Sequence, residues 1–256
     1  MLVDAHVHLD RYGEDIESTL AEIRQMQVLT ITVSMDIESY KVARILAKEE
    51  PLITPGFGIH PWNASKFVSS LDQLLPYIAE APVIGEIGLD YHFVEDASAY
   101  PAQREVFDFL LDAASRLGKP VNLHTKGAER EVVERIAAHA GVCAVVHWYS
   151  GPLAEMDRLL DLGAYFTVGV AVLCSSEVDE IAQRIPPERL LTETDNPGAW
   201  SWLSGTPGYP RLLLQVLDRL ARLRAVARDD LVKTIAANYD RLMKATSLKG
   251  TNTDSV

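Results

Sequence analysis

Two hydrophobic patterns alternate along most of the chain. Short apolar runs rich in β-branched residues predict buried strands, and longer segments whose apolar residues recur every three or four positions predict amphipathic helices. In residues 102–117, for example, Val106, Leu110, Ala113 and Leu117 recur at helical spacing. Eight strands are predicted, at residues 2–6, 30–34, 53–60, 83–89, 121–124, 144–147, 164–168 and 190–195.

Helices are predicted between most of these strands and after the last one. They cover residues 16–26, 39–49, 71–79, 102–117, 129–139, 153–162, 177–185, 212–224 and 229–245, and the Gly-, Pro- and Trp-rich stretch 196–210 is predicted as a loop. Strands and helices that alternate in this way build a parallel sheet. We therefore expect an α/β fold, in the form of a single (β/α)8 TIM barrel over residues 1–246 with an extra C-terminal helix. Residues 247–256 are polar and without periodicity, which predicts a disordered tail.

Length and composition agree with one barrel. The 256 residues are 48% hydrophobic and 23% charged, and one such barrel usually takes about 250 residues. The net charge of −12 argues against broad wrapping of duplex nucleic acid, which needs a basic face. Two cysteines are too few for a disulfide framework, and no long uncharged apolar stretch occurs. We expect a cytoplasmic protein with no membrane association and no obligate protein partner.

Titratable side chains gather where the predicted strands end. In this type of barrel the ends of the strands meet at one mouth, where catalytic groups collect. His6 and His8 are two residues apart, so they share one face of a strand. Five histidines with two carboxylates suit a first-row divalent metal, whereas a lone strand histidine is more often a satisfied core residue. The residues are His6, His8, His60, Glu86, His124, His147 and Asp195.

Seven short motifs stand out along the chain. They are Asp4-Ala5-His6-Val7-His8-Leu9-Asp10, Gly58-Ile59-His60-Pro61-Trp62, Gly85-Glu86-Ile87-Gly88-Leu89-Asp90-Tyr91, Gln103-Arg104-Glu105-Val106-Phe107, Pro120-Val121-Asn122-Leu123-His124, His147-Trp148-Tyr149-Ser150-Gly151 and Glu193-Thr194-Asp195-Asn196-Pro197. These motifs resemble those of the TatD-type metal-dependent deoxyribonucleases, which belong to the amidohydrolase-like barrels. The first motif is common to many metallohydrolases, but the string that contains Glu86 is far more specific. The resemblance runs from residue 2 to about residue 245.

The resemblance implies two divalent metal ions, for which Zn, Mn, Ni and Mg are all candidates. One ion would be held by His6, His8, Glu86 and Asp195, and the other by Glu86, His124 and His147, with Glu86 as the bridge. Two such ions would outweigh the charges of their two carboxylates. The mouth would therefore attract a phosphate despite the acidic chain.

Specific roles in catalysis or in support of the ligands are expected for several motif residues. Asp195 is our candidate for the base that takes the proton of the attacking water. The resemblance places His60 in the active site as a substrate-contacting or acid group, and the alternative is a histidine that only orients a ligand. Asp90, Tyr91 and Glu193 are expected to support the ligands or order the loops around them.

Two positions depart from the family pattern and bear on the substrate. Lys126 stands where the family usually has arginine, so a bidentate contact with phosphate would be replaced by the single charge of an ammonium group. Trp148 follows His147 where cysteine is usual, and its indole suits stacking on a base, although ordinary loop packing is the alternative.

The function expected is a deoxyribonuclease that cleaves phosphodiester bonds at single-stranded or frayed DNA ends by a two-metal mechanism. The alternative is a hydrolase of a small ester, lactone or amide, because the fold does not decide between them. A non-catalytic metal-binding protein is a third hypothesis. Cationic contacts near Lys126 and Arg211 would favour a phosphodiester substrate over a neutral one.

Overall fold

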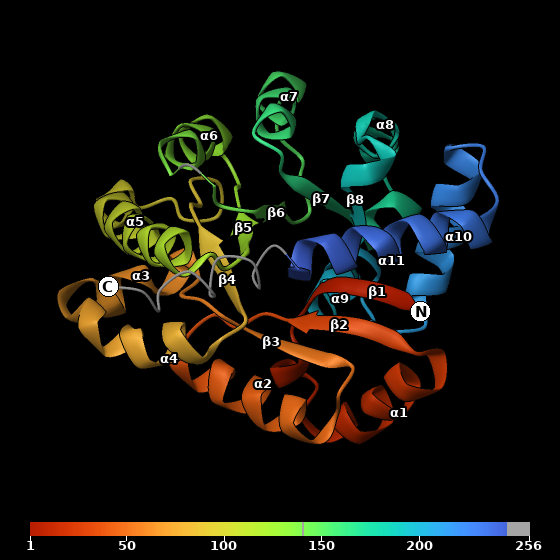
Figure 1. Cartoon of the computed structure of the whole chain (residues 1–256), viewed down its shortest axis with the longest axis horizontal. Coiled ribbons are helices and arrows are strands. Elements are labelled where there is room, and N and C mark those ends of the chain that lie inside the picture. The colour runs from red at the N-terminus through yellow and green to blue at the C-terminus, as the bar shows by residue number, and fades with distance from the viewer. Residues whose placement is uncertain (140, 245–256) are drawn as a thin grey trace, which may run out of the picture.

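The structure is a computed structural model that describes residues 1–139 and 141–244. Eight parallel strands follow one another around a barrel in sequence order, and helices surround them (Figure 1). Asp195 donates its backbone N–H to the His6 carbonyl (2.9 Å) and His8 donates to the Asn196 carbonyl (3.0 Å), which closes the barrel between its last and first strands. The predicted (β/α)8 barrel is confirmed. The strands are β1 (Leu2–Val7), β2 (Val28–Thr32), β3 (Ile53–Phe57), β4 (Val83–Gly88), β5 (Val121–His124), β6 (Ala144–Val146), β7 (Tyr165–Val168) and β8 (Leu190–Thr192).

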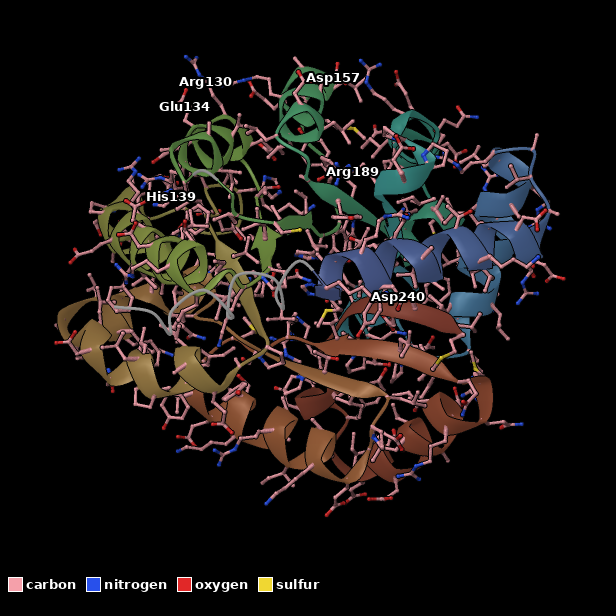
Figure 2. The ribbon with its side chains drawn as sticks, viewed as in Figure 1. Arg130, Glu134, His139, Asp157, Arg189 and Asp240 are labelled. Carbon is pink, nitrogen blue, oxygen red and sulfur yellow. The ribbon has the colours of Figure 1, made fainter. Side chains whose placement is uncertain are left out.

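The outer layer consists of helices with one apolar face and one charged face. Arg130 and Glu134 on α6 point away from the barrel and form an ion pair (3.1 Å; Figure 2). No helix within residues 1–139 or 141–244 combines the length and apolar composition needed to cross a membrane. The helices are α1 (Ile16–Met26), α2 (Ile37–Glu49), α3 (Ala64–Phe67), α4 (Leu75–Glu80), α5 (Tyr100–Leu117), α6 (Glu129–Ala138), α7 (Leu153–Asp161), α8 (Ser176–Arg184), α9 (Gly198–Ser204), α10 (Leu212–Leu223) and α11 (Arg228–Lys244).

Five strands end earlier than predicted, and for three of them the candidate residues therefore lie in the loops that follow. β3 stops at Phe57 because Pro61 begins a 3-10 turn, of which His60 is the first flanking residue. β8 stops at Thr192, and Asp195 has φ +49°, which no strand residue adopts. His147 likewise follows the end of β6.

One helix prediction and one loop prediction were also wrong in detail. The predicted helix at 71–79 is a 3-10 segment (Val68–Leu74) followed by α4, because Pro76 lacks the N–H that a continuous α-helix would use there. The predicted loop 196–210 contains the short helix α9. Pro197 precedes that helix and Gly205 follows it with a left-handed φ of +79°, which is a usual arrangement at helix ends. The tail at 247–256 lies outside the described residues.

A packed apolar core surrounds the strands and supports the mouth. Ile31, Ile84, Leu123, Val146 and Phe166 come from five different strands and are fully buried. Leu123 alternates with Asn122 and His124, so it faces the surrounding helices while they face the mouth. The polar residues buried at the ends of the strands are therefore the ones whose environment needs explanation.

Candidate metal centre

Glu86 on β4 lies at the centre of the mouth, with histidines on both sides of its carboxylate. Its Oε2 atom is 3.6 Å from His6 Nε2 and 3.5 Å from His8 Nε2. Its Oε1 atom is 2.9 Å from both His124 Nδ1 and His147 Nε2. The carboxylate is 2% exposed. Its two oxygens thus face two different histidine pairs.

A glycine allows β4 to lie close enough to β5 for this arrangement. Gly88 has φ +144°, and a Cβ atom at this position would overlap the backbone carbonyl of His124. A side chain there would push the two strands apart. The glycine of the Glu86 motif therefore helps to bring Glu86 and His124 side by side.

Asp195 closes the His6 and His8 side of the centre. Its Oδ1 atom is 3.6 Å from His6 Nε2 and 3.5 Å from His8 Nε2. Burial raises the pKa of Asp195, whereas His8 and His147 lower it. His6 and His8 thus lie between the carboxylates of Glu86 and Asp195.

The protonation of His6 follows from a neighbour on β5. The Asn122 side chain donates to the Ala5 carbonyl (2.9 Å), which turns its amide oxygen toward His6 Nδ1 at 2.8 Å. Because an amide oxygen only accepts, Nδ1 carries the proton, and burial keeps the pKa of His6 well below its usual value. The lone pair of Nε2 then faces two carboxylate oxygens, and this buried nitrogen has no hydrogen-bond partner among residues 1–139 and 141–244.

That arrangement fits a bound cation. A lone pair and two carboxylate oxygens repel one another unless a positive charge lies between them. Burial would raise the pKa of Glu86, but His60, His147 and His6 hold it well below its usual range, so the carboxylate is charged. Ligand atoms of His6, His8 and Asp195 all lie within 4.8 Å of one another. Imidazole and carboxylate groups at these spacings are suited to a divalent metal.

A second group of possible ligands lies around Glu86 Oε1. His147 Nε2 is 3.4 Å from His124 Nδ1, and both are 2.9 Å from that oxygen. Two further sets also bring their atoms within 4.8 Å, namely His6 with Glu86 and His147, and His60 with Glu86 and His124. The residues expected at a second ion therefore converge, and His60 lies beside them.

His124 is supported from behind by Asp90. Its Nε2 atom lies 2.9 Å from Asp90 Oδ2, while Nδ1 faces Glu86. Burial alone would lower the pKa of His124, but these two carboxylates raise it to about 9. Histidine ligands of metals are commonly held in this way by a carboxylate on their other nitrogen.

Glu193 lies behind His147. Its Oε2 atom is 3.8 Å from His147 Nδ1 and accepts a hydrogen bond from the Thr167 hydroxyl (2.6 Å). Its Oε1 atom accepts the backbone N–H of Trp148 (2.9 Å). Burial raises the pKa of Glu193 well above its usual value. Glu193 thus fixes the turn that carries His147.

His60 differs from the other histidines in the hydrogen atom it presents. Its Nδ1 atom accepts the backbone N–H of Trp62 (3.2 Å), and burial lowers its pKa to about 4. In the neutral ring the proton is therefore on Nε2, which lies 3.4 Å from Glu86 Oε1. His60 faces the mouth with a hydrogen-bond donor, whereas His6 presents a lone pair.

Comparison with known proteins agrees with the site. The profile of the TatD related DNase family matches residues 3–244. The chain belongs to the TatD family. The uncharacterized metal-dependent hydrolase YcfH of Escherichia coli strain K12 is 28% identical to it over 261 residues, which cover 94% of this chain and 95% of YcfH. The family resemblance of the motifs is thus confirmed, and the chain is a metal-dependent hydrolase.

Two further TatD proteins are similar to this chain. The crystal structure of YjjV, a TatD homologue from E. coli K12, has a TM-score of 0.84 and 26% sequence identity, and the match covers 94% of this chain and 97% of YjjV. A protein of Pantoea ananatis named 3'-5' ssDNA/RNA exonuclease TatD is 32% identical over 203 residues, which are 73% of this chain and 75% of that protein.

Lys126 and Trp148 lie together at the mouth of this TatD barrel. The Lys126 ammonium donates to the Trp148 carbonyl (2.5 Å) and to the Ser150 hydroxyl (2.8 Å), and it lies 5.6 Å from the centre of the Trp148 ring system. Trp148 has φ +37°, and its ring meets Trp202 edge to face at 5.9 Å. The two predicted substrate contacts thus form one unit.

Other residues singled out in the TatD sequence lie away from Glu86. The Tyr91 hydroxyl donates to Glu131 on α6 (2.8 Å), which ties the loop after β4 to the outer layer. Arg211 forms an ion pair with Glu22 (2.5 Å), so it is not a free cation at the mouth. His139, at the end of α6, packs between the Arg135 carbonyl and Asp112.

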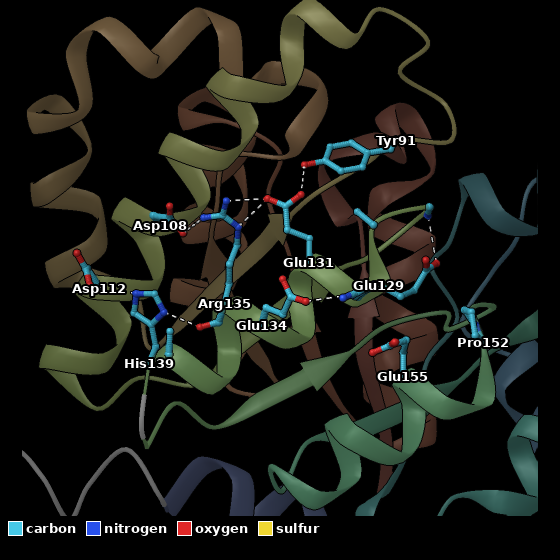
Figure 3. Close-up of a pocket in the computed structure, with 14 residues that line it drawn as sticks. Tyr91, Asp108, Asp112, Glu129, Glu131, Glu134, Arg135, His139, Pro152 and Glu155 are labelled. Atoms are coloured by element: carbon cyan, nitrogen blue, oxygen red, sulfur yellow. Dashed lines mark hydrogen bonds and ion pairs between the residues drawn. The ribbon is translucent and has the colours of Figure 1, made fainter.

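His139 belongs to an open groove on the outside of the barrel. The groove has a volume of about 970 Å³ and lies against α5, α6 and the start of α7. Figure 3 shows Arg135 between Asp108 and Glu131, with Tyr91 pointing toward Glu131. The charges in this groove are matched by neighbours, in contrast to those around Glu86.

Asn122 is the main site residue that sequence reasoning missed. It lies two positions before His124 on the same strand, so the alternation of strand side chains places both on one face. That spacing was an available signal. The link from Asp90 to Trp62 had no such signal, because it joins two loops that meet only in the folded chain.

Proposed function

We propose that the protein is a divalent-metal-dependent deoxyribonuclease that hydrolyses phosphodiester bonds at single-stranded or frayed DNA ends. The observation that carries this proposal is the position of Glu86 between two histidine pairs, with one carboxylate oxygen toward each pair. His6, His8, Glu86 and Asp195 would hold one ion, and Glu86, His124 and His147 the other. Two bound ions lower the pKa of a water toward about 7 and neutralise the charge that develops on a phosphate.

Asp195 and His60 are the groups that would handle protons. Asp195 is buried beside His6 and His8, and it would accept the proton of the attacking water. His60 presents Nε2–H toward the centre because the Trp62 backbone N–H occupies its other nitrogen. We assign it to the substrate, where it would donate a hydrogen bond to a phosphate oxygen or to the leaving group.

Two cationic side chains near the mouth favour a phosphodiester over a neutral substrate. Lys126 is held beside Trp148. Arg11, on the loop after β1, is exposed, contacts the Met35 sulfur and forms no ion pair with any described residue. Its guanidinium also lies against Gly198 at the start of α9. Arg11 thus takes the place that we had expected for Arg211.

The direct test is an assay of the metal-reconstituted protein on end-labelled single-stranded DNA, alongside a panel of lactones and esters. We expect stepwise shortening of the single strand, and slower reaction of a blocked or fully paired end. Glu86→Gln is the negative control, because it keeps the size of the side chain and removes its charge. Turnover of lactones or esters with none on DNA would replace this proposal with the small-molecule alternative.

Salt dependence gives a second measurement of the same proposal. An enzyme that grips one end of a strand neutralises few phosphates, and each contributes about −0.7 to the slope of log affinity against log salt for single strands. We expect a slope no steeper than about −2, which corresponds to about three phosphates. A much steeper slope would indicate a long footprint and contradict the end-specific proposal.

A further inference from the structure

Two exposed aromatic residues adjoin the metal centre on the side of β3 and β4. Trp62 follows His60 in the 3-10 turn Pro61–Asn63, and Phe93 lies in the loop after β4. Each is 51% exposed, and their ring centres are 6.1 Å apart at an interplanar angle of 77°. Exposed apolar residues are ordinary when scattered, but an adjacent aromatic pair at an active-site mouth forms a potential binding surface.

The carboxylate of Asp90 fixes this pair to the metal centre. Its Oδ2 atom accepts the indole N–H of Trp62 (2.7 Å) and lies 2.9 Å from His124 Nε2. Its Oδ1 atom accepts the backbone N–H of Phe93 (2.7 Å). Asp90 itself is fully buried, so its charge does not face a ligand at the surface. One side chain therefore sets the positions of both aromatic residues and of His124.

The ring contacts of Trp62 are perpendicular rather than stacked. The His60 and Phe93 rings meet Trp62 at 78° and 77°, so both contacts are edge to face. Within the part of the chain that the structure describes, no aromatic ring stacks parallel to Trp62 and no cation lies over it. An indole held by its polar edge and exposed over half its surface is suited to stack on a flat ligand.

A second aromatic pair lies across the mouth. Trp148 follows β6, and Trp202, which is 72% exposed, lies on α9 after β8. Because the eight strands follow sequence order around the barrel, β3 and β4 lie roughly opposite β6 to β8. The metal centre is therefore flanked by aromatic rings on two sides. A single strand that crosses the mouth could rest a base on each side of the phosphate at the centre.

We propose that Trp62 and Phe93 form a base-stacking subsite for single-stranded nucleic acid, held at a fixed position relative to the metal centre by Asp90. This inference rests on the proposed nuclease function. Every base has an aromatic face, so the subsite would bind strands of any sequence. Bases inside a duplex are already stacked and paired, so the subsite would favour single-stranded or frayed ends.

The test compares two strands that differ only in their bases. One is an ordinary single-stranded oligonucleotide, and the other has abasic residues near its reacting end. For Trp62→Ala we expect KM on the ordinary strand to rise about 5- to 100-fold, as for other base-stacking residues, with little change in kcat. KM on the abasic strand should be the same in the wild type and the variant. Phe93→Ala should act in the same direction, and Trp62→Phe should recover part of the loss.

Val226→Ala is the matched control, because Val226 is also a large exposed apolar residue (45%) but lies on the turn between α10 and α11. Its kinetics should equal those of the wild type on both strands. If Trp62→Ala changes KM equally on the ordinary and abasic strands, or changes neither, the subsite is refuted.

Binding separates this inference from the proposed function. Fluorescence anisotropy with a labelled single strand, protected from cleavage by phosphorothioate linkages, measures affinity without turnover. Binding that depends on Trp62 in a protein that cleaves no strand would support the subsite and refute the nuclease. Cleavage by a protein whose binding does not depend on Trp62 would support the nuclease function and refute the subsite. Absence of both binding and cleavage would refute the subsite and the nuclease function.

Discussion

The metal centre and the outer groove are both crowded with titratable side chains, yet their charges are arranged in opposite ways. In the groove, Glu131 accepts hydrogen bonds from Arg135 (2.7 Å; Figure 3) and from Arg104 (2.8 Å), so its charge is matched by two cations. At the mouth, Glu86 is surrounded by histidines, and His6 Nε2, which faces oxygens of Glu86 and Asp195, has no hydrogen-bond partner among the described residues.

The difference shows which feature marks a metal site. A large hollow lined with carboxylates is not enough, because the groove has both and satisfies its own charges. The mouth instead contains buried lone pairs that face carboxylate oxygens, an arrangement that costs free energy until a cation is added. Unmatched ligand atoms in a buried place are therefore the stronger indicator.

The largest effect should come from removing the bridge between the two histidine pairs. Glu86→Ala should reduce activity by more than the 10- to 100-fold typical of residues that only support metal ligands. It should also lower the metal content, measured by mass spectrometry of the purified protein, while circular dichroism stays that of the folded barrel. His60→Ala should lose less activity and keep its metal, since His60 presents a donor to the mouth. Equal, modest losses for both variants would contradict the central position of Glu86.

A smaller effect is expected from Asn122, which acts through His6. Asn122→Leu removes the acceptor that fixes the proton on His6 Nδ1. We expect metal affinity to fall about 10- to 100-fold, as for other residues behind metal ligands, in a competition assay against a chelator.

Asn238→Leu provides the control for that variant. Asn238 is also a fully buried asparagine, and it donates to the Pro187 and Leu190 carbonyls, away from the centre. Its replacement should lower the free energy of unfolding and leave metal affinity unchanged. A similar loss of metal affinity in both asparagine variants would mean that the effect of Asn122→Leu is general destabilisation.

The sequence predicts the barrel well because the fold depends on local periodicity. Val121–His124 and Tyr100–Leu117 each show their hydrophobic pattern within one element, and both were found nearly to the residue. The ends of elements depend on less regular signals. Asp195 was placed at the end of a strand, although a left-handed backbone at that residue carries it on a turn.

The sequence predicted which residues form the site, but it predicted the contacts between them less well. His6, His8 and Glu86 could be grouped because strand ends in this fold meet at one mouth. The positions of the protons on the histidine rings could not be predicted, because they depend on hydrogen-bond partners in the folded chain. These partners are Asn122 for His6 and the Trp62 backbone for His60. The supporting contact of Asp90 with both Trp62 and His124 likewise exists only after two loops and the end of β5 have come together.

The smallest expected effect tests the other half of the comparison, in the groove. Burial would raise the pKa of Glu131, but Arg104, Arg135 and Tyr91 lower it from 4.5 to about 2. A carboxyl whose pKa is depressed by folding stabilises the folded state above its unfolded pKa, and this contribution disappears as the pH falls toward the folded pKa. Glu131→Gln should therefore lower the free energy of unfolding by about 1 kcal/mol or less at neutral pH, because the network is partly exposed.

The difference between wild type and Glu131→Gln should shrink as the pH is lowered from 4.5 toward 2, which urea unfolding at a series of pH values would measure. Activity and metal content should equal those of the wild type, since the charges of the groove are already matched by Arg104 and Arg135. A direct route by which the groove could affect the mouth is the Tyr91 hydroxyl, which joins Glu131 to the loop that carries Asp90. A loss of activity as large as that of His60→Ala would show that this route matters and that the two charged regions are coupled.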